Sequence, residues 1–98
     1  MIRPEDLYGI GHYDYGEEYF GSDKGMRFRV ARQPLENVIG KKPEEWLSTD
    51  PRLSASVWFT PFSYEKTPKE EITVKEFSYD SEGYTEMIDW LNTETEKG

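Results

Sequence analysis

Residues 53–60 alternate between apolar side chains at odd positions and polar ones at even positions, with Trp58 as the one exception. A repeat of two residues is typical of a β-strand that buries one face. This strand constrains the fold most, because Leu53, Val57 and Phe59 would otherwise lie in water. Another element of the chain must therefore cover it.

The best cover is an amphipathic segment near the C-terminus. Tyr84, Met87, Ile88 and Leu91 are spaced as i, i+3, i+4 and i+7, which predicts an apolar stripe along an α-helix. The Asp-Ser pair at residues 80–81 is a suitable N-cap for this helix. We therefore expect the helix to start there and to pack on the strand at 53–60.

Two further strands are predicted. Residues 26–32 are apolar at even positions up to Val30, which is typical of a second amphipathic strand. Residues 71–79 form the third, but their apolar phase shifts midway, which predicts a bulge near Lys75 and Glu76 or a break into two short strands.

The remaining segments predict connections and ends. Residues 21–25 are rich in turn-forming residues and indicate a hairpin loop, whereas residues 1–20 indicate an aromatic N-terminal arm or an edge strand. Residues 34–51 form a long inter-strand loop, which we expect Trp46 to attach to the body of the protein. The polar residues 93–98 are expected to be a frayed tail.

These elements predict a single α+β domain over residues 1–98. Its three- to four-stranded antiparallel sheet has one face covered by the C-terminal helix. This arrangement is similar in outline to small single-stranded DNA-binding folds, as an analogy of architecture that does not carry function.

The composition narrows the classes of function. The chain has 12 Lys and Arg against 20 Asp and Glu, a net charge of −8, which repels a phosphate backbone at long range. It has no cysteine, which fits a reducing compartment, and it contains no apolar run long enough for a membrane span. We therefore expect a cytoplasmic protein that has no contact with a membrane.

The candidate binding site is the sheet face opposite the helix. A tryptophan close to two arginines is a combination enriched at binding hot spots, and the residues expected on this face are Arg27, Arg29, Ser56, Trp58 and Lys75. One alternative is that the N-terminal arm covers Trp58 while the arginines pair with Glu17 and Glu18. The others are that the face binds a protein partner or a second copy of the chain, or that it stacks the bases of a single-stranded nucleic acid.

Catalysis and cofactors have little support in the sequence. His12, the one histidine, lacks a positioned partner, and Gly9-Ile10-Gly11 lacks the strand and helix that flank phosphate-binding loops. Neither of the two carboxylate sets, residues 14–18 and 82–89, has the spacing of a calcium loop. We therefore predict a non-enzymatic interaction module without a cofactor or a metal, and single-stranded nucleic-acid binding is the alternative.

Overall fold

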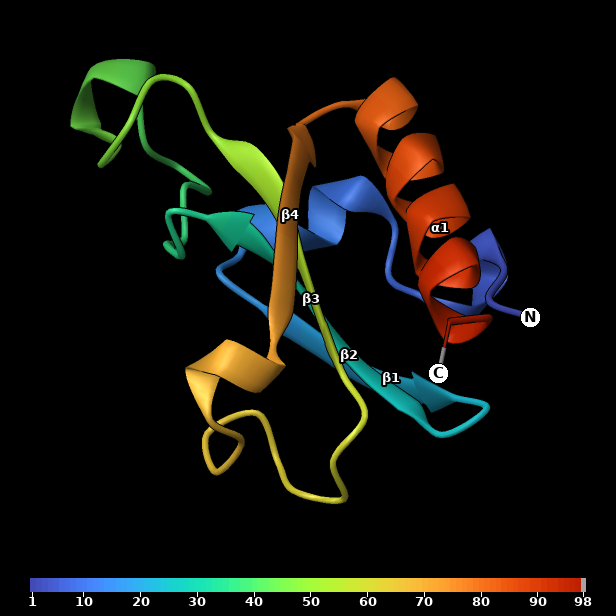
Figure 1. The fold of residues 1–98 in the computed structure, drawn as a ribbon. Helices are drawn as coiled ribbons and strands as arrows, with labels where there is room; N and C mark the ends of the chain where they lie inside the picture. Colours follow the sequence, from blue (N-terminus) through green and yellow to red (C-terminus); the bar gives the residue numbers. More distant parts are fainter. Residues whose placement is uncertain (98) are drawn as a thin grey trace.

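Four strands form one antiparallel sheet, in which each strand pairs with the next one along the chain. The computed structural model describes residues 1–97. The strands are β1 (Glu18–Asp23), β2 (Met26–Gln33), β3 (Arg52–Trp58) and β4 (Thr73–Ser78), and the helix α1 (Ser81–Thr95) follows (Figure 1). The predicted α+β class, with an antiparallel sheet packed against the C-terminal helix, is confirmed.

Short 3-10 helices interrupt the connections. They are η1 (Pro4–Asp6), η2 (Ile10–Asp14), η3 (Pro43–Glu45) and η4 (Lys69–Glu71). The predicted hairpin loop is shorter than expected, because β1 and β2 are joined by Lys24 and Gly25 alone, both with positive φ. This is the two-residue turn whose twist matches that of paired strands.

The core lies between the sheet and α1. Leu53 and Val57 of β3 are almost completely buried, as are Met87 and Leu91 of the helix, and all four belong to one apolar cluster. The predicted strand and helical stripe therefore meet as expected. Phe59 does not join them, because β3 ends at Trp58 and Phe59 is 45% exposed.

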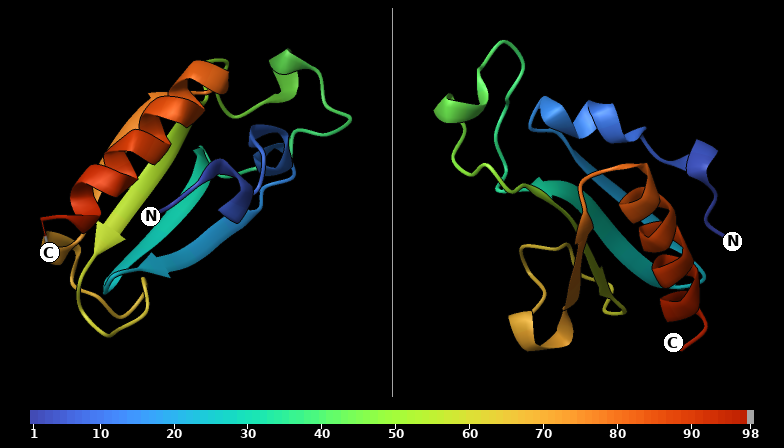
Figure 2. Two further views of the ribbon diagram at one scale, coloured as in Figure 1. Left: turned by 90° about the vertical axis from the view of Figure 1, so that its right-hand side faces the viewer. Right: turned by 90° about the horizontal axis from the view of Figure 1, so that it is seen from above.

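The N-terminal arm covers the part of this same sheet face that α1 leaves bare. Figure 2 shows α1 over β3 and β4, with the arm beside it over β1 and β2. Ile2, Leu7 and Tyr13 of the arm are buried in the same cluster as the helix residues. The alternative that the arm covers the opposite face is therefore wrong, because one helix is too narrow to cover a four-stranded sheet.

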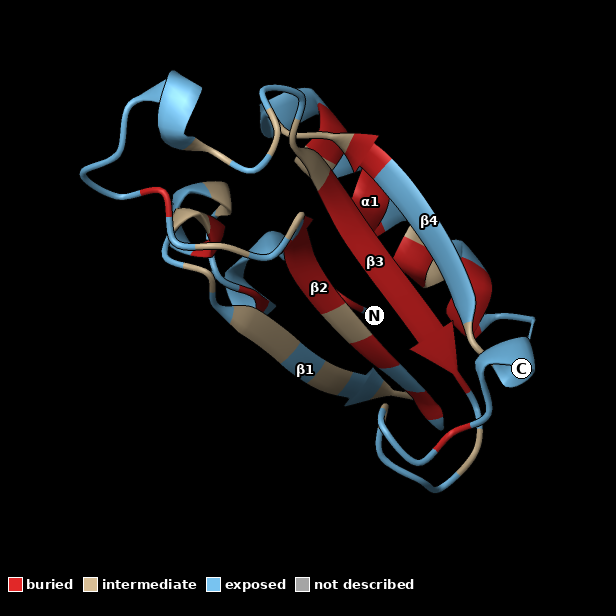
Figure 3. Cartoon of the chain, turned by 90° about the vertical axis from the view of Figure 1, so that its left-hand side faces the viewer, coloured by how far each residue is buried: buried red, intermediate tan, exposed pale blue. Residues whose placement is uncertain are grey.

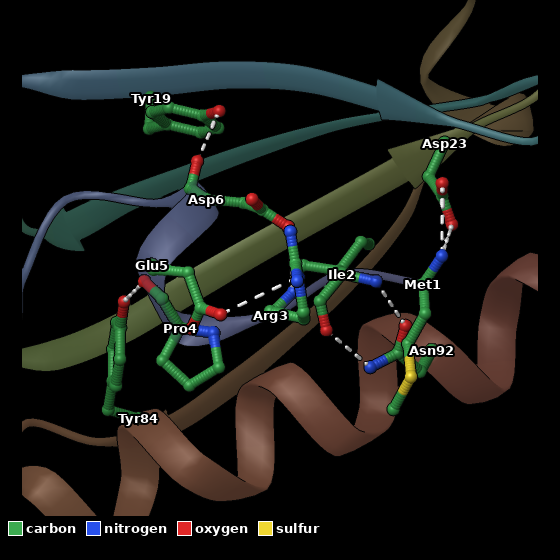
Figure 4. Close-up of polar contacts among 10 residues, drawn as sticks. All are labelled: Met1, Ile2, Arg3, Pro4, Glu5, Asp6, Tyr19, Asp23, Tyr84 and Asn92. Carbon is green, nitrogen blue, oxygen red and sulfur yellow. Dashed lines mark hydrogen bonds and ion pairs between the residues drawn. The ribbon is translucent and has the colours of Figure 1, made fainter.

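Side chains of α1 hold the arm by its backbone. The Asn92 amide accepts a bond of 2.8 Å from the Ile2 N–H and donates one of 2.9 Å to the Ile2 carbonyl (Figure 4). About two helical turns earlier, the Tyr84 hydroxyl donates to the carbonyls of Pro4 and Tyr8. These bonds satisfy backbone groups that have no strand to pair with.

Arg32 is a charged residue that is buried on the helix side of the sheet. It lies opposite Leu53 in the pairing of β2 with β3 and is 1% exposed. Its Nη1 donates to the Pro34 carbonyl at 2.7 Å and to a Glu36 oxygen at 3.2 Å. A buried guanidinium needs such partners, because an unpaired charge in an apolar interior is very costly.

The same arginine anchors the long loop at 34–51. Its guanidinium lies 5.5 Å from the centre of the Trp46 ring, so Trp46 attaches the loop as expected. Glu36 also accepts a bond of 2.8 Å from the Leu47 N–H, and the Val38 N–H donates to the Asp14 carbonyl at 2.8 Å. The loop is thus tied to β2, to itself and to η2.

Two predictions about the C-terminal third were wrong. Strand β4 pairs with β3 without a bulge from Thr73 to Ser78, so the apolar phase shift leaves Val74 55% exposed on the face away from α1. The helix reaches Thr95, with Glu94 and Thr95 buried, so the polar tail begins later than residue 93. Gly98 lies outside the described residues.

Asp80 caps α1 as predicted. One carboxylate oxygen accepts bonds of 2.8 Å from the Gly83 N–H and from the Ser78 hydroxyl. The bond from the Gly83 backbone is the main reason that the pKa of Asp80 lies below its ordinary value. The cap draws the first turn of the helix against the end of β4.

This close approach of α1 to the end of β4 explains why residue 83 is a glycine. A Cβ at Gly83 would overlap the carbonyl oxygen of Ser78. We expect Gly83→Ala to lower the free energy of unfolding by about 2–3 kcal/mol in urea titrations, since the end of β4 must shift. Helix propensity alone predicts the opposite, a gain of about 1 kcal/mol. Glu86→Ala on the exposed side of α1 is the control, with a change within about 0.5 kcal/mol. A stabilised Gly83→Ala variant would contradict the packing argument.

Buried tyrosines make the fold sensitive to alkali. Burial raises the pKa of Tyr13 above its ordinary value of 10.0, and burial together with a hydrogen bond to Asp14 does the same for Tyr79. Their contribution to stability is present below about pH 10 and is lost as the pH rises further, because the unfolded chain releases these protons first. Urea unfolding at about pH 9 and about pH 11 should show a loss at the higher pH. The double variant Tyr13→Phe and Tyr79→Phe should lose less free energy of unfolding between the two pH values than the wild type. An equal loss in the wild type and the variant would contradict the assignment of the alkaline sensitivity to these two tyrosines.

Candidate functional site

The face of the sheet away from α1 carries a mixture of polar, charged and aromatic side chains, and we call it the outer face. Figure 3 shows this face, with α1 behind the strands. The strand register places on it Glu18, Phe20 and Ser22 of β1, Arg27, Arg29 and Ala31 of β2, Ser54, Ser56 and Trp58 of β3, and Val74 and Glu76 of β4.

The residues predicted for the site lie in different surroundings. Arg27 and Arg29 are on the outer face as expected, the first exposed and the second half-buried. Ser56 and Trp58 are on it too, but they are only 1% and 2% exposed. Of these four residues, Arg27 alone is exposed.

Lys75 is a correction to the predicted set. It pairs with Ala55 in the register of β3 with β4, which places it on the helix side of the sheet. The expected bulge would have turned it to the outer face, and the regular pairing of β4 does not. Its ammonium group lies 5.4 Å from the centre of the Phe77 ring.

The loop between β3 and β4 covers Trp58. The indole N–H of Trp58 donates to the Phe62 carbonyl at 2.9 Å, and its ring centre lies 5.5 Å from that of Tyr64. Trp58 is therefore buried, as one of the alternatives had it, but the cover is this loop and not the N-terminal arm. Trp58 supports the loop that builds the surface, and it offers a partner little area of its own.

Hydrogen bonds close the loop on itself. The Thr67 hydroxyl donates to the Ser63 carbonyl at 2.8 Å and shares a bond of 2.8 Å with the Thr60 hydroxyl. Thr67 is only 4% exposed, so these bonds are shielded from water. The loop is thus an ordered platform that places Tyr64 over the outer face.

The two arginines differ in their electrostatic state. Arg29 forms an ion pair with Glu18 through its Nε, and its guanidinium lies 5.0 Å from the centre of the Tyr64 ring. Its charge is therefore neutralised and covered. Within residues 1–97, Arg27 forms no ion pair, so its charge is available at the surface.

Two hollows flank Tyr64 on the outer face. The first encloses about 340 Å³, and its lining includes Phe20, Arg27, Phe28, Trp58, Tyr64 and Glu65. The second encloses about 350 Å³ on the side of β4, and its lining includes Tyr64, Glu65, Lys69, Ile72 and Val74. Phe20 is 53% exposed and Val74 is 55% exposed, so an apolar side chain stands at the edge of each hollow.

The sequence reasoning missed three of these residues. Phe20 was expected in the arm and Tyr64 in a loop, and the expectation that Lys75 faces outward left Val74 on the helix side. The aromatic residues between Pro61 and Pro68 were the available signal for an ordered loop. Their position over Trp58 depends on the path of the loop, and local pattern does not encode that path.

The other candidate groups do not assemble into a reactive site. His12 is exposed and lies against Tyr8 with the two rings tilted and their centres 3.9 Å apart, while Asp14 accepts a bond from the Tyr79 hydroxyl. Within the described residues, neither carboxylate set gathers into a group that could hold a metal ion. In the same part of the chain, α1 and the short helices are too short or too polar to cross a membrane.

Comparisons with protein-family models, curated protein sequences and solved structures find no match for this chain. The function of the chain must therefore be inferred from the geometry of the outer face.

The role of Trp58 as a support for the loop can be tested by Trp58→Phe, which keeps a ring but removes the N–H donor. We expect a loss of about 1 kcal/mol in the free energy of unfolding, since the Phe62 carbonyl loses its main partner. The amides of Lys66 and Thr67, which bond to the Ser63 carbonyl, should exchange with solvent faster.

Trp90→Phe serves as the control, because Trp90 packs against Phe77 on the helix side. It should leave exchange in the loop unchanged. Unchanged protection of both amides in Trp58→Phe would show that the indole bond does not hold the loop.

Proposed function

We propose that this protein is a non-enzymatic interaction module that binds a protein partner through the outer face, at the hollows on either side of Tyr64. The observation that carries the proposal is the ordered loop platform. It creates two neighbouring hollows with exposed apolar edges at Phe20 and Val74. Exposed aromatic and apolar groups around a rigid floor are typical of binding surfaces.

The charge pattern favours a protein partner over a nucleic acid. Arg29 is neutralised by Glu18 and Trp58 is covered, so within residues 1–97 the two hollows offer one unpaired arginine, Arg27, and no freely accessible tryptophan. The net charge of −8 adds repulsion toward a phosphate backbone. Single-stranded nucleic-acid binding through the same face is therefore the weaker alternative. Binding of a fluorescent single-stranded oligonucleotide whose affinity falls steeply with added salt would support this alternative.

A second copy of the chain is one form that the protein partner can take. Light scattering over a wide range of concentrations distinguishes this form, because self-association makes the mass depend on concentration. A mass that doubles in the wild type but not in Phe20→Asp would assign the outer face to a homodimer.

The proposal is tested with peptides selected from a random displayed library on the immobilised protein. We expect Phe20→Asp and Val74→Asp to lower the affinity for the selected peptides by at least about tenfold, because each variant places a charge at an apolar contact. Thr85→Asp adds the same charge on the exposed side of α1 and should change affinity by less than about twofold.

Two results would contradict the proposal. One is selected peptides that bind the outer-face variants as tightly as the wild type. The other is that no peptide is enriched and the mass stays that of a monomer.

A further inference from the structure

We propose that the hollow between Phe20 and Tyr64 binds an apolar side chain, aromatic or branched aliphatic, that lies next to a carboxylate in the partner. The occupant is thus a peptide segment in which an apolar anchor adjoins an acidic residue or a C-terminal carboxylate. This inference rests on the proposed function and specifies the class of partner.

The walls of the hollow specify the apolar anchor. Phe20, Tyr64 and Trp58, all aromatic, line the hollow on the outer face. Trp58 is held by its bond to the Phe62 carbonyl, so the floor is preformed and costs little ordering on binding. The volume of about 340 Å³ is at the lower end of the range for ligand sites, which suits one or two side chains.

The charges around the hollow specify the carboxylate. Arg27 lines it, is exposed, and forms no ion pair within residues 1–97, whereas the charge of Arg29 is already paired with Glu18. A guanidinium binds a carboxylate through two parallel hydrogen bonds, which orients the ligand as well as attracting it. Glu65 also lines the hollow, so a carboxylate is repelled there and is directed toward Arg27.

The acidic character of the whole protein does not oppose this arrangement strongly. At physiological ionic strength, charges more than about 8 Å apart at the surface are largely screened. A carboxylate in contact with Arg27 therefore depends on its near neighbours more than on the net charge of −8. The long-range repulsion slows the approach of an acidic segment and leaves the contact itself intact.

The test compares N-acetyl-phenylalanine, which has a ring and a carboxylate, with N-acetyl-phenylalaninamide, which has the ring alone. Each is titrated into the full chain while the three tryptophan indole N–H signals are followed by NMR. We expect the Trp58 signal to shift and those of Trp46 and Trp90 to stay. The acid should bind about two- to fivefold more tightly than the amide at low salt.

Variants of Arg27 show whether the guanidinium causes the preference. Arg27→Gln should make the two probes bind equally, while Arg27→Lys should keep part of the preference through its charge. Phe20→Ala should weaken both probes alike, because it removes a wall and leaves the charge. An unchanged pattern of the other amide signals confirms that each variant is folded.

The outcomes separate this inference from the proposed function. If acid and amide bind the wild type equally, the inference that the partner carries a carboxylate is wrong. If neither probe shifts the Trp58 signal, the inference that the hollow binds an apolar side chain is wrong. In both cases the displayed peptides still decide whether the outer face binds a partner. A preference that survives Arg27→Gln would also overturn the assignment to Arg27.

Discussion

The arrangement of this protein follows from the burial of β3 on both of its faces. Residues Leu53 to Trp58 are all buried, although only alternate members point toward the helix. A single helix cannot shield four strands, so other parts of the chain must complete the cover. The N-terminal arm completes the helix side, and the loop after β3 covers the outer face at Trp58. The positions of both irregular segments are thus consequences of one strand.

The burial of Arg32 organises the opposite end of the sheet in a similar way. Its guanidinium donates to the Pro34 carbonyl and to Glu36, and it lies 5.5 Å from the centre of the Trp46 ring and 5.8 Å from that of Tyr79. Replacing both members of a buried ion pair with apolar residues is often tolerated, but removing one leaves an uncompensated charge at a cost of about 3–5 kcal/mol. Arg32 and Glu36 are therefore best understood as a unit that specifies the path of the 34–51 loop.

The outer face illustrates how a residue can matter for binding without touching a partner. Tryptophan is a residue type enriched at binding hot spots, yet the indole N–H of Trp58 donates to the Phe62 carbonyl and its ring packs against Tyr64. The surface that a partner meets is built from the residues that Trp58 positions. Arg27 remains the exposed charge beside that surface. A rigid floor with a few groups at its edge provides affinity at low entropic cost.

Local periodicity was sufficient to predict the α+β class, the strands around Val30 and Val57, and the capped helix that begins after Asp80. Each of these depends on neighbours within a few residues, where alternation and helical spacing are reliable signals. The same reasoning placed Arg27 and Arg29 on the outer face, because parity along a strand is a local property. It also recognised that a tryptophan on that face required an explanation.

Only the tertiary structure decided which side chains meet. Lys75 lies on the helix side because β4 pairs without a bulge, Arg32 is buried because β2 extends beneath the long loop, and Tyr64 covers Trp58 because the loop turns back over the sheet. These outcomes depend on register and on contacts between residues distant in the sequence, which no local pattern determines. The sequence by itself therefore determined α1, β2 and β3 and the faces of each, because local spacing sets them. Pairing and packing decided the faces of β4 and which side chains cover each face of the sheet.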